Sequence, residues 1–297
     1  MRERRCFVQF IHPGGEHQPD ESDLKHWNQA HHRRKFLTSE GRWLDHGELH
    51  EGELEFWGEW EPESRVVRRY DDSIPDGPRF LYEPFFSRRR EPGWRQNTDP
   101  FVFGSEFHYT GCLQHTQRGE TQLRHLAPGS VILFGSCRQR RRFVIDTVFV
   151  VSERHLDHTA ASYRQTLKPA VSDVYWAVTG DPWYSAEVNP EQSHRLYFAA
   201  NYEHPIGGMF SFFPCLPHGA YRSGFARPEI TIPGFITSHL FQGKKITRDL
   251  NLRELHELWS SVAEQVQQQR LKLGVFAQLP AEQADGQEAP RTSAGRC

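Results

Sequence analysis

The segment Asn97-Thr98-Asp99-Pro100-Phe101 carries the densest group of side chains that could do chemistry. Asp99 offers a carboxylate, and the proline that follows it restricts its backbone. Asn97 offers hydrogen-bond donors and an acceptor, which suits an amide-like edge. Phe101 and Phe103 are two residues apart and therefore lie on one side of a strand. The pattern predicts a nucleobase stacked on a ring beside an acidic group. The alternative is an Asx-type turn that leads into a core strand.

Two further carboxylates are candidates for acid–base work. In the alternating strand 54–60, Glu59 shares a face with Trp57, which either contacts a ligand or packs under a covering loop. Asp146 lies in the run 143–151, where both faces are apolar. A buried carboxylate must be paired or have a raised pKa, so Asp146 is a second acid–base candidate. The alternative for Asp146 is a structural ion pair with a nearby arginine.

Three basic clusters interrupt a chain whose formal net charge is only −2. Arginine dominates them, and its guanidinium group suits phosphate oxygens. The clusters therefore predict a locally positive surface that holds a DNA backbone, with solvated turns as the alternative. They are His31-His32-Arg33-Arg34-Lys35, Arg88-Arg89-Arg90, and Arg138 with Arg140, Arg141 and Arg142.

The remaining composition argues against several classes of protein. The 17 histidines and five scattered cysteines form no zinc-protease, zinc-deaminase or C-x-x-C pattern, and no glycine-rich phosphate loop or G-x-S-x-G elbow is present. We therefore expect neither a metal nor another cofactor. The cysteine pattern fits a reducing compartment, and no apolar run approaches the ~20 residues of a membrane span. We expect a cytoplasmic protein without a membrane partner, and the oligomeric state is left open.

Hydrophobic periodicity predicts many strands, few helices and no βαβ rhythm. The expected class is α+β, with a mixed or antiparallel sheet and one long helix over 250–271. One alternative is that the sheet closes into a barrel. We expect a single domain over 1–279 with a long inserted loop near 71–100, no regular element over 20–52, and a disordered tail over 280–297. The expected strands are 6–11, 54–60 paired with 65–70, 101–103, 107–109, 130–134, 143–151, 171–178, 195–200, 209–213, 229–232 and 273–277, with a short helix within 157–167.

Asp99-Pro100-Phe101 resembles the water-activating motif of uracil-DNA glycosylases. Thr98 stands where that family has glutamine, and the family's late His-Pro-Ser stretch has no match. The resemblance implies water activation by Asp99 and stacking by Phe101. More widely, the chain resembles bacterial proteins of nucleobase modification and phage defence, which include DNA glycosylases that remove glycosylated cytosines. The stretches that carry this resemblance are 7–14, 56–61, 97–104 and 129–135.

These observations favour a hydrolase, a monofunctional DNA glycosylase that excises a modified base, such as a glucosylated hydroxymethylated one, and leaves an abasic site. Asp99 would act on the water or the sugar cation, with Glu59 or Asp146 as alternatives. Asn97 would read the base, and arginines 88–90, 138 and 140–142 would hold phosphates. The rings expected around the flipped base are Phe101, Phe103, Trp57, Trp60 and Tyr109. The alternatives are a non-catalytic module that binds a modified base and a metal-dependent nuclease.

Overall fold

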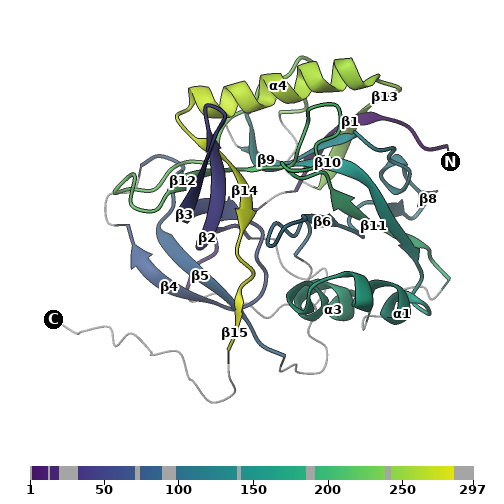
Figure 1. The fold of residues 1–297 in the computed structure, drawn as a ribbon, viewed down its shortest axis with the longest axis horizontal. Helices are drawn as coiled ribbons and strands as arrows, with labels where there is room; N and C mark the ends of the chain where they lie inside the picture. The colour runs from purple at the N-terminus through teal and green to yellow at the C-terminus, as the bar shows by residue number, and fades with distance from the viewer. Residues whose placement is uncertain are drawn as a thin grey trace.

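Strands dominate the computed structural model, which describes residues 2–12, 14–19, 33–70, 74–88, 98–138, 142–184, 191–237 and 242–283. Most of them belong to two mixed sheets, and one long helix lies along the outside (Figure 1). The predicted α+β class with a mixed sheet is therefore confirmed. Among the described residues, no helix is both long and apolar enough to cross a bilayer.

The first sheet has six strands, and its centre is the long hairpin of β9 and β10. Parallel pairing of β1 with β9 makes the sheet mixed, while its other pairings are antiparallel. In spatial order the strands are β13 (Gly243–Arg248), β1 (Cys6–Ile11), β9 (Val131–Arg138), β10 (Arg142–His158), β11 (His194–Ala199) and β6 (His108–Tyr109).

The second sheet has seven strands, and its centre is the hairpin of β2 and β3. Because β14 also pairs with β2, four of the strands close a ring. The strands β5, β15 and β4 continue the sheet beyond that ring, so the barrel-like version of our prediction is wrong. The strands are β14 (Lys272–Ala277), β12 (Phe213–Pro217), β3 (Glu48–Gly58), β2 (Lys35–Asp45), β5 (Phe80–Phe86) and β15 (Ala281–Glu282), with β4 (Ser64–Arg69) on β5.

Helix α4 (Leu252–Gln268) is the predicted long helix. It begins with a capping box in which Asn251 and Glu254 satisfy each other's backbone N–H groups. Its apolar stripe, including Leu255, Trp259 and Val262, packs on the core. The other helical segments are short: η1 (Gln122–Arg124), α1 (Tyr163–Leu167), η2 (Lys168–Ala170), α2 (Asp173–Tyr175), the π-helical η3 (Trp176–Gly180) and α3 (Asp181–Tyr184), while β7 (His115–Thr116) and β8 (Gly119–Glu120) form a small hairpin.

Several sequence predictions about individual elements are wrong. Strand β2 and the first half of β3 lie within 20–52, and β5 lies in the expected loop 71–100. The expected strand 171–178 is helical, because Ser172 caps a helical turn there. Strand β4 pairs with β5 rather than with β3. Strand β15 lies inside the expected disordered tail, of which residues 284–297 are outside the described part.

Candidate ligand-binding site

A pocket of about 540 Å³ opens where loops of the two sheets meet. The hairpin of β9 and β10 forms one wall, β3 contributes Trp57, and loops after β1, β4 and β12 complete the lining. The volume is within the range of about 300–1,000 Å³ typical of small-molecule sites. The lining residues are Gly14, Gly15, Glu16, Trp57, Pro75, Asp76, Gly77, Ser136, Cys137, Arg142 and Arg227.

Arg227 is the buried cation of the pocket, with an exposed fraction of 5%. Its Nη1 donates to both carboxylate oxygens of Asp146, at 3.1 and 3.4 Å. Its Nη2 donates to the Gly14 carbonyl at 3.2 Å, and its guanidinium carbon lies 5.9 Å from the Trp57 ring centre. Three protein groups therefore fix the position of this guanidinium before any ligand arrives.

Behind Arg227, a chain of buried charges continues into the protein. Arg34 Nε donates to Asp146 at 2.8 Å, and Arg34 Nη1 lies 3.3 Å from Glu59. The same oxygen of Glu59 lies 2.8 Å from His12 Nδ1. Burial lowers the pKa of Arg34, but the carboxylates of Glu59 and Asp146 outweigh burial and raise it. The two arginines and two carboxylates balance in charge, as buried ions must.

A second arginine, Arg142, lines the pocket, and its side chain is 30% exposed. Its Nη2 lies 3.0 Å from Asp76 and its Nη1 lies 3.2 Å from Glu229. The pair with Asp76 joins the β9–β10 hairpin to the turn 74–77. Glu16 binds the backbone that follows the turn 74–77. Its Oε1 accepts the backbone N–H groups of Arg79 and Phe80 at 2.6 and 3.0 Å.

Ser136 contributes a hydroxyl group to the lining. Its side chain is buried, and its Oγ has no hydrogen-bond partner among the described residues. A buried hydroxyl without a partner costs free energy, and such groups are rare in folded proteins. A ligand group in the pocket would satisfy it.

The structure brings four of the sequence-predicted residues to this region and changes their roles. Trp57 and Arg142 line the pocket, and Glu59 and Asp146 lie behind it as members of the buried ion chain. Trp57 is no exposed stacking surface, because Phe36, at a centroid distance of 5.3 Å, and Arg227 flank its ring. Asp146 follows the alternative interpretation of a structural ion pair, although with Arg227 and Arg34 rather than with the nearby arginines.

Asp99 lies elsewhere, in the core, with an exposed fraction of 1%. Its carboxylate accepts the backbone N–H groups of Thr110 and Cys112 at 2.9 and 3.3 Å. Burial raises its pKa well above the usual range, although these hydrogen bonds lower it. The carboxylate is thus held by backbone 11 and 13 residues further along the chain, which is not the local contact of an Asx-type turn, and the catalytic role of Asp99 stays a prediction.

The predicted aromatic walls are part of the core as well. Phe103 packs against Phe101 at a centroid distance of 5.6 Å and against Trp60 at 5.1 Å. Tyr109 is fully buried and donates its hydroxyl to the Cys112 carbonyl. These rings belong to one hydrophobic cluster, and Trp57 belongs to another. The structure therefore does not bring them together with Trp57 around the pocket.

The basic clusters are only partly described. Arg34 and Lys35 are buried, so these two residues do not belong to a positive surface. Arg88 is exposed and pairs with Asp173 and Glu282 at 3.2 and 3.0 Å. Asn97, His31, His32, Arg89, Arg90, Arg140, Arg141 and the side chain of Arg138 lie outside the described residues.

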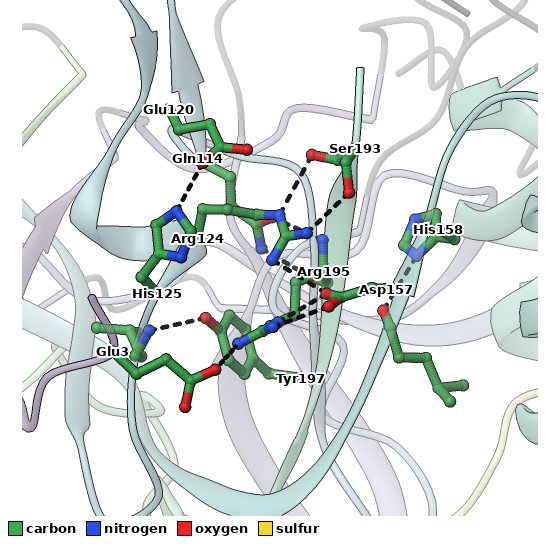
Figure 2. Close-up of polar contacts among 12 residues, drawn as sticks. Glu3, Gln114, Glu120, Arg124, His125, Asp157, His158, Ser193, Arg195 and Tyr197 are labelled. Carbon is green, nitrogen blue, oxygen red and sulfur yellow. Dashed lines mark hydrogen bonds and ion pairs between the residues drawn. The ribbon is translucent and has the colours of Figure 1, made fainter. Parts of the chain in front are cut away.

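A second polar cluster surrounds Asp157 (Figure 2). Arg195 binds both oxygens of Asp157 at 2.7 and 2.8 Å, and it reaches Glu3 at 2.5 Å. Arg124 lies 3.0 Å from Asp157 and donates to the Ser193 hydroxyl at 2.8 Å. Both guanidinium groups are thus engaged by protein acceptors, and the cluster ties the N-terminal segment to β11.

No grouping of three or more His, Cys, Asp or Glu side chains in the described part of the chain is placed to hold a metal ion. Comparisons with protein-family models, with curated proteins and with solved structures found no match. The site must therefore be interpreted from its own geometry.

Sequence reasoning missed Arg227, Ser136, Glu16 and Asp76 as lining residues. Two signals were present: Gly14-Gly15 directly before Glu16, and the turn sequence Pro75-Asp76-Gly77. No local pattern marks Arg227 or Ser136, because only the approach of distant strands gives them a pocket.

Proposed function

We propose that the pocket binds a nucleobase, and that the natural ligand is a modified base carried by DNA. The observation that carries this proposal is the pocket itself, which combines a volume of about 540 Å³ with a lining of fixed donors and acceptors. Arg227 and Ser136 offer donors, and Glu16 and Asp76 offer carboxylate acceptors. A base edge alternates donors and acceptors in the same manner, so such a lining can distinguish one base from another.

The sequence beside the pocket supports DNA as the carrier. Cys137 and Arg142 both line the pocket. The four residues between them in the chain include Arg138, Arg140 and Arg141. Arginines that lie in the sequence between two lining residues suit a ligand that carries phosphates as well as a base.

Replacing Ser136 with alanine should weaken binding without weakening the fold. The variant loses one hydrogen bond to the ligand, so we expect the affinity for a nucleoside to fall about fivefold. Its free energy of unfolding should stay the same or rise, because the lost hydroxyl has no partner among the described residues. Titration calorimetry with deoxycytidine and 5-hydroxymethyldeoxycytidine, together with urea unfolding, would measure both quantities.

Ser211→Ala is the matched control for Ser136→Ala. Ser211 is buried to a similar degree, but its Oγ accepts the backbone N–H of Val150 at 2.7 Å. We expect this variant to lose stability and to keep the affinity of the wild type. Equal binding by the wild type and Ser136→Ala would remove Ser136 from the proposed site.

Base excision is the second candidate function, and two carboxylates in the pocket lining favour it. Cleavage of an N-glycosidic bond develops positive charge on the sugar, which a carboxylate stabilises while it orients water. Glu16 and Asp76 are the carboxylates that line the pocket directly. The metal-dependent nuclease gains no such support from the described residues.

Glu16→Gln tests excision with little change to the fold, because a glutamine oxygen can accept the same two backbone N–H groups. If Glu16 acts on the sugar or on water, we expect release of the base to fall about 100-fold while binding persists. The assay is mass spectrometry of bases freed from unmodified and glucosylated phage DNA. Unchanged release in Glu16→Gln would exclude this role, and no release by the wild type would leave the binding function alone.

A further inference from the structure

Both arginines of the pocket are already neutralised by carboxylates. Arg227 binds Asp146 through two contacts, and Arg142 lies between Asp76 and Glu229. The lining itself holds two cations, Arg142 and Arg227, and two anions, Glu16 and Asp76. The carboxylate of Asp76 lies 3.0 Å from Arg142, so a phosphate that approached Arg142 would also approach this carboxylate. Two negative charges so close together repel each other.

We propose that the interior of the pocket accepts the uncharged base or nucleoside and excludes phosphate, which in DNA stays outside, and that Asp76 determines this selectivity by masking Arg142. This inference rests on the proposed function and specifies its ligand class. It reverses the usual role of an arginine beside a nucleic-acid site. Arg142 contributes donors and shape to the pocket and does not act as a phosphate anchor.

The position of Asp76 supports this assignment. It stands in the turn 74–77, where the backbone N–H of Gly77 donates to the Ile74 carbonyl at 2.9 Å. Asp76 itself has a positive φ of 63°, a conformation that aspartate and asparagine tolerate better than most residues. The turn thus holds one carboxylate at the pocket and 3.0 Å from Arg142.

Asp76→Asn removes the charge and keeps both the shape and the backbone conformation. In the wild type we expect deoxycytidine to bind at least about fivefold more tightly than its 5′-monophosphate. In the variant, affinity for the monophosphate and for inorganic phosphate should rise about fivefold, since Arg142 loses one of its two partners. Because Asp76 also offers an acceptor to the base, affinity for deoxycytidine should not rise in the variant, so the gain is specific to phosphate. The gain should shrink as ionic strength increases, because salt screens exposed charges.

The matched control is Glu203→Gln. Glu203 pairs with Arg42 at 3.0 Å, and its arginine is 31% exposed, close to the 30% of Arg142. The control removes the same charge from an equivalent ion pair away from the pocket, so phosphate affinity should not change. Circular dichroism and urea unfolding of both variants would verify that they fold.

The possible outcomes separate this inference from the proposed function. Failure of the wild type to bind any nucleoside would refute the proposed function, while the phosphate titrations of Asp76→Asn would still test the masking. Tighter binding of the monophosphate than of deoxycytidine by the wild type would overturn the selectivity. No gain in phosphate affinity in Asp76→Asn, or an equal gain in Glu203→Gln, would overturn the role of Asp76.

Discussion

Replacing Asp146 with alanine should lower the free energy of unfolding by about 3–5 kcal/mol. The substitution leaves the guanidinium groups of Arg34 and Arg227 buried without their shared carboxylate. Breaking a buried ion pair on one side is costly, because the remaining charge has lost its solvent and its partner. A typical domain is stable by only about 5–15 kcal/mol, so much of the fold's stability depends on this carboxylate. Urea unfolding monitored by circular dichroism would measure the loss.

Asp249→Asn provides the contrast for this prediction, because asparagine tolerates the positive φ of 62° at this position as aspartate does. Asp249 lies 2.6 Å from Arg4, but their side chains are 64% and 39% exposed. Exposed ion pairs contribute little, so we expect a change below about 1 kcal/mol. A loss as small as this in Asp146→Ala would show that the buried ion chain is not formed in solution, and Arg227 would then lack the support that fixes it in the pocket.

The parts of the fold that the sequence predicted are those with strong local patterns. Helix α4 has a long apolar stripe and a capping box, and β10 has an apolar run over 143–151 that only Asp146 and Thr147 interrupt. The hairpin of β2 and β3 was partly missed because it is polar at its outer end, with exposed residues from Glu48 to Glu51. At this outer end the two strands are stabilised by their pairing with each other. Such pairing leaves no hydrophobic periodicity in the sequence.

The candidate site was predicted in part, and for partly wrong reasons. The alternation of the sequence over 54–60 placed Trp57 and Glu59 on one face, and the apolar run within β10 marked Asp146 as buried. What the sequence could not supply was the partner of each charge. Arg34 lies 112 residues from Asp146 and Arg227 lies 81 residues from it, so only the fold brings them together. For the same reason the sequence suggested that the Asp99 carboxylate could act on a ligand. In the fold this carboxylate accepts the backbone N–H groups of Thr110 and Cys112.

The second large effect that we expect is a loss of stability as pH falls from about 6.5 toward 4. Burial lowers the pKa of His108 and His158 to about 4 and that of His194 to about 3. The unfolded chain takes up protons on these rings near pH 6.5, while the folded chain keeps them neutral. Stability from these groups is therefore complete above pH 6.5 and falls with decreasing pH until the folded protein also binds the protons.

Each histidine should lower the free energy of unfolding by about 1.4 kcal/mol per pH unit within this window, or by about 2 kcal/mol at pH 5. The three together approach the whole stability of a typical domain, so we expect unfolding in mildly acidic buffer. The buried carboxyl of Asp99 acts in the opposite direction. Burial raises its pKa, so the folded chain binds this proton more readily and gains relative stability as pH falls.

His194→Phe separates the histidine effect from that of Asp99. Both ring nitrogens of His194 lack a hydrogen-bond partner among the described residues, so an apolar ring removes no hydrogen bond there. We expect wild type and variant to differ by less than about 1 kcal/mol at pH 7.5, where the imidazole is neutral in both states. At pH 5 the variant should be more stable by about 2 kcal/mol, because it no longer has a ring that protonates on unfolding. Urea unfolding of both proteins at the two pH values gives this difference, in which the contribution of Asp99 cancels. A variant that loses stability with acid as steeply as the wild type would show that His194 is protonated in the folded protein, and so that solvent or a polar ligand reaches a ring that the fold encloses.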